Sequence, residues 1–270
     1  MLELPARYYR HIVDPGVENT EANLHYEDRV LPLPAADTAL VLVDCWCEHQ
    51  IAGLADRMRP VIDDHIIPAL HAARDSPLTV VHCPGPAVAA TYPEFRVPGA
   101  SDDVTRDAAP NASASEWPPD SFRDRTGDAH VFARYEDEQA MAAADFDWPP
   151  DGINAALEPV AEEPVVADGE ELHRLLSDRD IRHLIYVGFH TNWCLQHRTY
   201  GMRAMRDKGY NIVLLRECTC AVETHETVPD MRQEAAAIRD IELQVGWTAS
   251  VTDFLEGVRK REDDQSNDAT

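Results

Sequence analysis

Two residues with reactive side chains follow apolar segments that have the pattern of buried strands. The first is Asp44, which closes the almost uninterrupted apolar run over residues 38–43. In an open parallel sheet, ligands bind outside the carboxyl ends of the strands, so a carboxylate at this point is a candidate proton acceptor. It can equally be an exposed acid or a cap for the following turn. The sequence alone leaves these roles open.

The second residue is Cys194, at the end of Gly-Phe-His-Thr-Asn-Trp-Cys, residues 188–194. This segment joins an apolar run to a helix-like stretch. In the first turn of a helix, the positive end of the macrodipole favours a thiolate, and free backbone N–H groups can stabilise an oxyanion. Cys194 is therefore a candidate nucleophile. The alternative is a buried thiol that packs as a small hydrophobic side chain.

The segments that must position these two residues alternate between strands and helices. We expect strands at 38–46, 78–84, 183–189 and 211–218, and an edge strand at 242–248. Helical patterns lie between them, at 57–75, 168–176, 192–209 and 228–240. Such alternation is typical of parallel β pairing with helices on both faces of the sheet.

The domain organisation follows from where this alternation stops. Residues from about 85 to 151 contain paired prolines and little periodicity, which predicts a long irregular insertion that partly covers the site. We expect one domain over residues 1–258, with this insertion inside it. The acidic segment 259–270 is expected to be a solvated tail.

The composition excludes several classes of protein. The chain has 270 residues, with 24 Lys and Arg against 49 Asp and Glu, which gives a formal net charge of −25. Such a surface repels phosphate backbones and anionic membranes, so we expect neither nucleic acid nor membrane as a partner. No apolar run reaches the length of a transmembrane helix, and the first residues lack a signal-peptide core. We expect a cytoplasmic protein whose six cysteines are free thiols.

The two motifs and their surroundings resemble the isochorismatase-like cysteine hydrolase superfamily. The matching features are Ala-Leu-Val-Leu-Val-Asp at Asp44, the segment ending at Cys194, and Gly209-Tyr210 before the next strand. The resemblance covers residues 36–84 and 153–255. It implies a Rossmann-like, three-layer αβα fold with a parallel six-stranded sheet. It also implies a homo-oligomer that acts on a small-molecule substrate, for which we expect no cofactor.

The resemblance also implies an activity, the hydrolysis of a C–N bond in a small amide, ureido or carbamoyl compound. Cys194 is then the nucleophile that forms a thioester, and Asp44 shuttles the proton. The oxyanion donors are the backbone N–H groups of His190 and Cys194. A cis peptide between Phe189 and His190 aims the first of these groups.

The chain departs from the resemblance at the third member of the catalytic triad, a lysine. The corresponding position falls at about Ala161, beside Glu162 and Glu163, and the chain contains only two lysines, Lys208 and Lys260. We expect both of them away from the site. Glu162 is the candidate replacement.

The missing lysine has an electrostatic consequence. A cation beside a thiol and a carboxyl favours both charged forms, so its loss raises the pKa of Cys194 and of Asp44. Cys194 is then expected to rest as a thiol. Arginines of the insertion can bring charge but cannot exchange protons near neutrality. His190, His197 and His82 are candidate helpers in proton transfer.

Aromatic residues near the two motifs are candidates for the wall of a substrate pocket. These candidates are Trp46, His82 and Trp193, and core packing is the alternative for both tryptophans. Two pairs, Cys45-x-Cys47 and Cys218-x-Cys220, close strands at the same edge. Their spacing is not that of common zinc sites, so we expect no metal.

Two other functions remain open at this point. The missing lysine and the long insertion also fit a member of the fold that has lost hydrolysis and serves as a binding or assembly partner. An Asp44-dependent hydrolysis of the vinyl ether of isochorismate is the other alternative, and it would not require Cys194.

Overall fold

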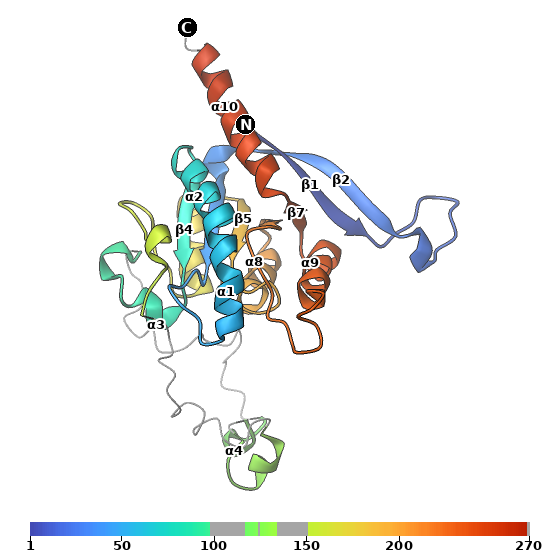
Figure 1. Ribbon diagram of the computed structural model, residues 1–270, viewed down its shortest axis with the longest axis vertical. Coiled ribbons are helices and arrows are strands. Elements are labelled where there is room, and N and C mark those ends of the chain that lie inside the picture. The colour runs from blue at the N-terminus through green and yellow to red at the C-terminus, as the bar shows by residue number, and fades with distance from the viewer. Residues whose placement is uncertain (98–116, 124, 134–150, 269–270) are drawn as a thin grey trace.

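The computed structural model describes residues 1–97, 117–123, 125–133 and 151–268. At its centre lies a seven-stranded sheet with the order β2-β1-β7-β6-β5-β3-β4 (Figure 1). The strands are β1 (Leu2–Arg10), β2 (His25–Leu33), β3 (Thr38–Val43), β4 (Thr79–Cys83), β5 (His183–Gly188), β6 (Asn211–Leu215) and β7 (Trp247–Ala249). The five strands from β3 to β7 are parallel, and β1 pairs antiparallel with both β2 and β7.

The strand β3 is apolar throughout because both of its faces are covered. Leu40 and Leu42 belong to the hydrophobic core on one side of the sheet. Ala39, Val41 and Val43 alternate with them and belong to the core on the other side. This two-residue alternation places the carboxyl end of β3 between two packed layers.

Helices form the two outer layers. The first layer contains α1 (Ala52–Val61), α2 (Ile67–Arg74) and α10 (Val251–Asp268), joined to the first core by Leu54, Leu70 and Phe254. The second layer contains α6 (Gly169–Asp178), α8 (Met202–Asp207) and α9 (Arg232–Gln244), joined to the second core by Leu172, Met202 and Ile241. In Figure 1, α1 and α2 run across the sheet and α10 extends beyond it. The predicted αβα layering is therefore confirmed.

Shorter helical segments complete the described chain. They are η1 (Glu21–Asn23), η2 (Ala35–Asp37), η3 (Ile62–Ile66), α3 (Pro86–Ala89), η4 (Pro93–Phe95), α4 (Asp120–Arg123), η5 (Gly127–Phe132), η6 (Ala155–Leu157) and α7 (Cys194–His197). The η3 segment is a π-helical turn between α1 and α2, so the helix predicted over 57–75 is interrupted there. Much of the predicted insertion, residues 98–116, 124 and 134–150, lies outside the described residues.

The sheet has seven strands instead of the predicted six because the N-terminal residues form a hairpin. In β1, the buried residues Leu2, Leu4 and Ala6 alternate with exposed ones, which is the pattern of a strand with one covered face. Two residues of β1, Ala6 and Arg7, pair with β7. The prediction of an edge strand at 242–248 was therefore wrong, since β7 lies inside the sheet and α9 extends to Gln244.

The C-terminal segment also differs from its predicted form. Helix α10 continues through Asp268, so most of the segment expected to be a tail from residue 259 is helical. Among the helices in the described ranges, none combines the length and the apolar composition that a membrane span requires.

Candidate active site

The structure brings together the side chains of Asp44 and Cys194. Strands β3 and β5 are parallel neighbours, with Val43 opposite Gly188, so the residues that follow the two strands leave the sheet at the same edge. There the Cys194 thiol comes close enough to the Asp44 carboxylate for the two side chains to interact directly and to shift each other's pKa. This arrangement places a proton acceptor directly beside a sulfur nucleophile.

Both oxygens of the Asp44 carboxylate have further partners that the sequence did not indicate. Tyr200 donates its hydroxyl hydrogen bond to Oδ1 at 3.0 Å, and Arg198 donates from Nε to Oδ2 at 3.2 Å. The Asp44 side chain is almost fully buried, with 1% of its surface exposed. Its backbone lies in the left-handed region, with φ of 46°, which few residues other than glycine adopt. The chain thus turns sharply after β3 and holds the carboxylate in place.

A break in the helix after Cys194 brings Arg198 and Tyr200 to this position. The prediction of one helix over 192–209 was wrong, because α7 ends after one turn at His197 and α8 begins at Met202. Gly201 lies between them, and a Cβ at this residue would be 2.9 Å from backbone atoms of Gln196 and Arg198. Residues two positions apart on a regular helix point in directions about 160° apart. An unbroken helix could therefore not direct both Arg198 and Tyr200 at one carboxylate.

The electrostatics of the pair favour a resting thiol. Burial raises the pKa of Cys194, the negative charge of Asp44 raises it further, and the positive charge of Arg198 opposes both effects. Burial also raises the pKa of Asp44, against the charge of Arg198 and the hydrogen bonds from Cys194 and Tyr200. Because α7 is a single turn, its macrodipole contributes less than a full helix would. The cation beside the pair in the described part of the chain is Arg198.

The turn before Cys194 contains the predicted oxyanion donors. The peptide bond between Phe189 and His190 is cis, as the resemblance implied. The carbonyl of His190 accepts hydrogen bonds from the N–H groups of Trp193 and Leu195, at 2.9 and 3.4 Å. This tight turn places the backbone N–H groups of His190 and Cys194 on one short loop.

The His190 side chain is a buried, neutral imidazole. Burial lowers its pKa to about 3, and electrostatic interactions with His49 and Arg57 lower it as well, against the hydrogen bond with the Cys220 carbonyl. Its Nδ1 lies 3.2 Å from the carbonyl oxygen of Cys220, whereas Nε2 has no hydrogen-bond partner within the described ranges. An uncharged ring of this kind can fix the position of the oxyanion loop, but it does not add positive charge to the site.

A cavity of about 210 Å³ is lined by Trp46 and His49 together with residues of α1 and η3. The rings of His49 and His190 are 5.0 Å apart. Asp44 and Cys194 do not line this cavity, so the role of Trp46 as a wall of the substrate pocket stays a prediction. Trp193 is 47% exposed, and its ring lies 6.4 Å from that of His190, so it borders the site from the solvent side.

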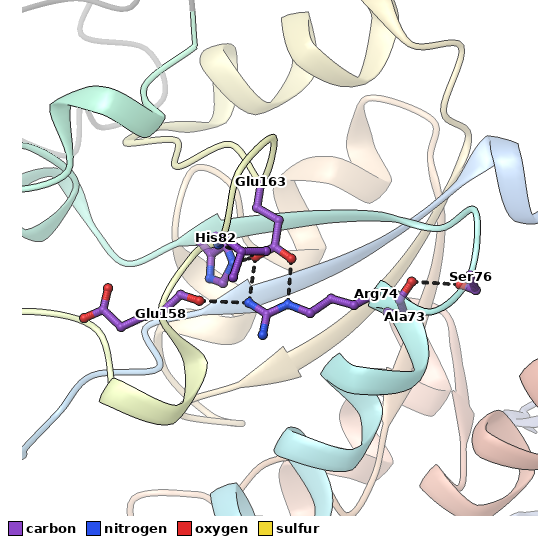
Figure 2. A network of polar contacts seen from close by, with 7 residues as sticks. Ala73, Arg74, Ser76, His82, Glu158 and Glu163 are labelled. Carbon is purple, nitrogen blue, oxygen red and sulfur yellow. Dashed lines mark hydrogen bonds and ion pairs between the residues drawn. The ribbon is translucent and has the colours of Figure 1, made fainter.

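His82 lies in a separate buried network, shown in Figure 2. Its Nε2 is 2.9 Å from Oε2 of Glu163, and Arg74 donates to both carboxylate oxygens of Glu163 at 2.7 and 2.8 Å. His82 is not among the residues that line the 210 Å³ cavity. Glu162, the predicted replacement for the lysine, is exposed, with its backbone φ at 74°. The buried acid of this segment is Glu163, and its partner is Arg74.

The network attaches the segment 163–166 to the edge of the sheet. The N–H of His82 donates to the carbonyl of Pro164, and the N–H of Val166 donates to the carbonyl of His82, both at 2.9 Å. The segment thereby lies parallel to β4. This is the segment in which the resemblance implied a lysine, and here it is held by the ion pair of Glu163 with Arg74.

We expect the variant Glu163→Gln to lower the free energy of unfolding by about 2 kcal/mol at pH 7, since it leaves Arg74 without its buried charge partner. Burial opposes ionisation of Glu163, but the hydrogen bonds from Arg74, His82 and the Val160 N–H outweigh it and lower the pKa to about 2. A lowered pKa contributes stability above the ordinary value of 4.5, and this contribution is lost as the pH falls towards 2.

Urea unfolding at pH 7 and pH 3 measures both parts of this prediction, and Glu162→Gln is the matched control. The exposed control is expected to change stability by less than about 0.5 kcal/mol. A Glu163→Gln protein as stable as the control at pH 7, or a difference that grows on acidification, would contradict the assignment.

Neither lysine of the chain lies at these two sites, and the cysteines show no disulfide or metal cluster in the described ranges. Lys208 pairs with Glu170, with Nζ 2.6 Å from Oε1, and Lys260 is exposed on α10. All six cysteines are free thiols. Within the described ranges, no group of three or more His, Cys, Asp or Glu side chains is arranged to hold a metal ion.

The comparisons with known proteins identify the family and the fold of the chain. The family model of the isochorismatase domain matches residues 38–253, which is more than half of the chain. The chain therefore belongs to the isochorismatase family. Among curated proteins, it is similar to the ureidoacrylate amidohydrolase RutB of Enterobacter sp. (strain 638), with 36% identity over 90 residues. That match covers 32% of this chain and 34% of the relative, so it spans about a third of RutB.

A solved structure shows the same fold. A cysteine hydrolase from Pseudomonas syringae pv. phaseolicola 1448A superposes with a TM-score of 0.56 at 16% identity. The superposition covers 85% of this chain and 96% of that protein. At this level of identity, the similarity concerns the fold, an α/β arrangement with a mostly parallel sheet.

Proposed function

We propose that this protein is a cysteine-dependent hydrolase that cleaves a C–N bond of a small amide, ureido or carbamoyl compound. The observation that carries the proposal is that the Cys194 thiol and the buried carboxylate of Asp44 meet and interact directly at the carboxyl edge of the sheet. Membership of the isochorismatase family supports it. So does the partial similarity to RutB, which is named as a ureidoacrylate amidohydrolase.

In the first half-reaction, the thiol attacks the carbonyl carbon of the substrate. The S–H proton moves to Asp44 as the S–C bond forms, and the negative charge develops on the carbonyl oxygen. The backbone N–H groups of His190 and Cys194 would stabilise this oxyanion. The C–N bond then breaks, Asp44 returns its proton to the leaving nitrogen, and ammonia or an amine departs. The product of this step is a thioester at Cys194.

In the second half-reaction, water hydrolyses the thioester. Asp44 is again a carboxylate and accepts a proton from the attacking water. The C–S bond breaks, the acid product leaves, and the proton from Asp44 returns to the sulfur. The cycle restores the carboxylate of Asp44 and the thiol of Cys194, and the raised pKa of Cys194 favours that thiol at rest.

A panel assay for ammonia release tests the proposed reaction. The purified protein is incubated with small primary amides, ureido acids and carbamoyl compounds, and with isochorismate as the substrate of the alternative reaction. We expect ammonia from at least one C–N substrate, at a rate that Cys194→Ala removes. Turnover of isochorismate alone, or of no compound in the panel, would contradict the proposal.

A further inference from the structure

The site has a permanent positive charge that the sequence analysis did not identify. Neither lysine of the chain is available, since Lys208 pairs with Glu170 and Lys260 is exposed on α10. We propose that Arg198 is the cation of this site in place of a lysine, and that it positions Asp44 and favours the ionised form of Cys194 without exchanging a proton. This inference rests on the proposed function, which assigns Cys194 and Asp44 as the reacting groups.

The first support is the geometry around the carboxylate. Arg198 holds Oδ2 of Asp44 through Nε at 3.2 Å, while Tyr200 holds Oδ1 at 3.0 Å. With one donor on each oxygen, the carboxylate cannot rotate without losing a hydrogen bond. The orientation in which Asp44 faces the Cys194 thiol is therefore fixed.

The second support is the packing around this cluster. Gly85, two residues after β4, has a positive φ of 91°, a conformation that favours glycine, and a Cβ there would lie 3.4 Å from Nη2 of Arg198 and 3.7 Å from Oδ1 of Asp44. These are ordinary contact distances, so the backbone at Gly85 packs against both the guanidinium and the carboxylate. The cluster thus joins Asp44, directly after β3, to Gly85, beyond β4, and to Arg198, which follows the short helix α7.

The third support is the interaction of Arg198 with the sulfur itself. The positive charge of Arg198 and its side-chain interaction with Cys194 lower the pKa of that thiol, against burial. The Arg198 side chain is 23% exposed, so water screens its charge only in part. Any negative charge that the sulfur carries, as in the free thiolate, lies beside this fixed positive charge.

An arginine and a lysine would differ at this position in one chemical respect. A guanidinium keeps its proton up to a pH of about 12, whereas a lysine ammonium ordinarily loses its proton near a pH of about 10.4. Arg198 therefore supplies charge and orientation but no proton. The proton that leaves with the nitrogen then has to come from Asp44, which received it from Cys194.

The rate of Cys194 alkylation by iodoacetamide, resolved by peptide mass spectrometry, tests the inference without a substrate. At pH 7 we expect Arg198→Met and Arg198→Gln to lower this rate by about tenfold or more, because loss of the charge raises the pKa of the thiol by at least about one unit. Arg198→Lys is expected to stay within about threefold of the parent, since its ammonium can reach the same oxygen.

The control is Arg203→Met, in the neighbouring helix α8, where Arg203 pairs with Asp240 and Gln196. We expect the alkylation rate of Cys194 to be unchanged in this variant. Circular dichroism accompanies each measurement, and unfolding would accelerate alkylation, which is the opposite of the expected effect. Unchanged alkylation in Arg198→Gln would overturn the inference.

A pH profile of turnover separates a charge from a structural role. Arg198→Lys is expected to lose turnover above a pH of about 10, as the lysine deprotonates, whereas the parent protein keeps it there. Identical profiles would contradict the inference. If alkylation depends on Arg198 while no compound releases ammonia, the proposed function fails and the role of Arg198 stands. If ammonia is released while alkylation is independent of Arg198, the reverse holds.

Discussion

The variant Cys194→Ala is expected to lower kcat for ammonia release by about 10⁴-fold or more, which is the typical effect of removing a nucleophile. The reason is that no thioester can form once the sulfur is absent. The change from a half-buried thiol to a methyl group leaves the sheet and both helical layers intact. Steady-state ammonia release measures the effect, and near-ultraviolet circular dichroism checks the fold.

The same variant decides between the alternatives that the sequence left open. A protein that retained more than about one-tenth of its turnover without Cys194 would use another nucleophile, and the assignment of Cys194 would be wrong. Cys194→Ser provides the second comparison, because a hydroxyl preserves the volume and the hydrogen bond to Asp44 but ionises far less readily than a thiol. We expect its activity to be as low as that of the alanine variant within about tenfold.

The variant Asp44→Asn is expected to change two measurable quantities in opposite directions. Turnover should fall by about 10³-fold, within the range of general acid–base contributions, because an amide cannot accept the proton from Cys194 or return it to the leaving group. Alkylation of Cys194 at pH 7 should become faster, because the charge of Asp44 raises the pKa of the thiol and its removal lowers that pKa.

This combination distinguishes a proton shuttle from a residue that only keeps the site folded. A purely structural aspartate would lower turnover without accelerating alkylation of a protein that remains folded. Asp37, which is on the surface and pairs with Arg182, provides the control variant Asp37→Asn. We expect this control to leave both turnover and alkylation unchanged. Slower alkylation in Asp44→Asn would show that the carboxylate activates the thiol at rest, contrary to the pKa directions.

The two reacting residues could be predicted from the sequence because their signals are local. An apolar strand followed by an acid, and an apolar strand followed by Gly-Phe-His-Thr-Asn-Trp-Cys, place both side chains at the carboxyl edge of a parallel sheet. The parallel pairing of β3 with β5 then brings these two side chains next to each other. The sequence distance of 150 residues between Asp44 and Cys194 is therefore no obstacle to the prediction.

Arg198 and Tyr200 could not be predicted in the same way. The stretch over 192–209 reads as one amphipathic helix, on which these two residues point in nearly opposite directions. The break between α7 and α8 brings Gly201 close to the backbone of Gln196, and the Tyr186 hydroxyl donates to the carbonyl of Tyr200 there, a tertiary contact that the sequence does not indicate. A glycine inside a helical pattern was the one available signal, since glycine is unfavourable in helix interiors.

The ion pair of Glu163 with Arg74 was also hidden from sequence analysis. The two residues are 89 positions apart, and neither lies in a motif. The acidic pair Glu162 and Glu163 indicated a change at the position of the implied lysine, but not which of the two acids is buried. That outcome depends on the segment 163–166 lying beside β4, which leaves Glu162 in solvent and brings Glu163 to Arg74.

The N-terminal hairpin was missed for a different physical reason. Its two strands have one largely exposed face, and each contains a proline, Pro5 in β1 and Pro32 in β2. Proline removes a backbone donor and is typical of edge strands or loops. The antiparallel pairing over Leu2–Arg10 and His25–Leu33 nevertheless adds two strands to a sheet whose other members were mostly evident from their apolar runs.

Mass spectrometry of the protein quenched during turnover detects the proposed thioester at Cys194 itself. With a substrate found by the panel assay, we expect an added mass equal to the acyl part of the substrate, without its nitrogen leaving group. This mass should lie on the peptide that contains Cys194 and on no other cysteine peptide, and hydroxylamine should remove it as a hydroxamate. Ammonia release with the adduct on a different residue, or with neither adduct nor hydroxamate formed, would contradict the account.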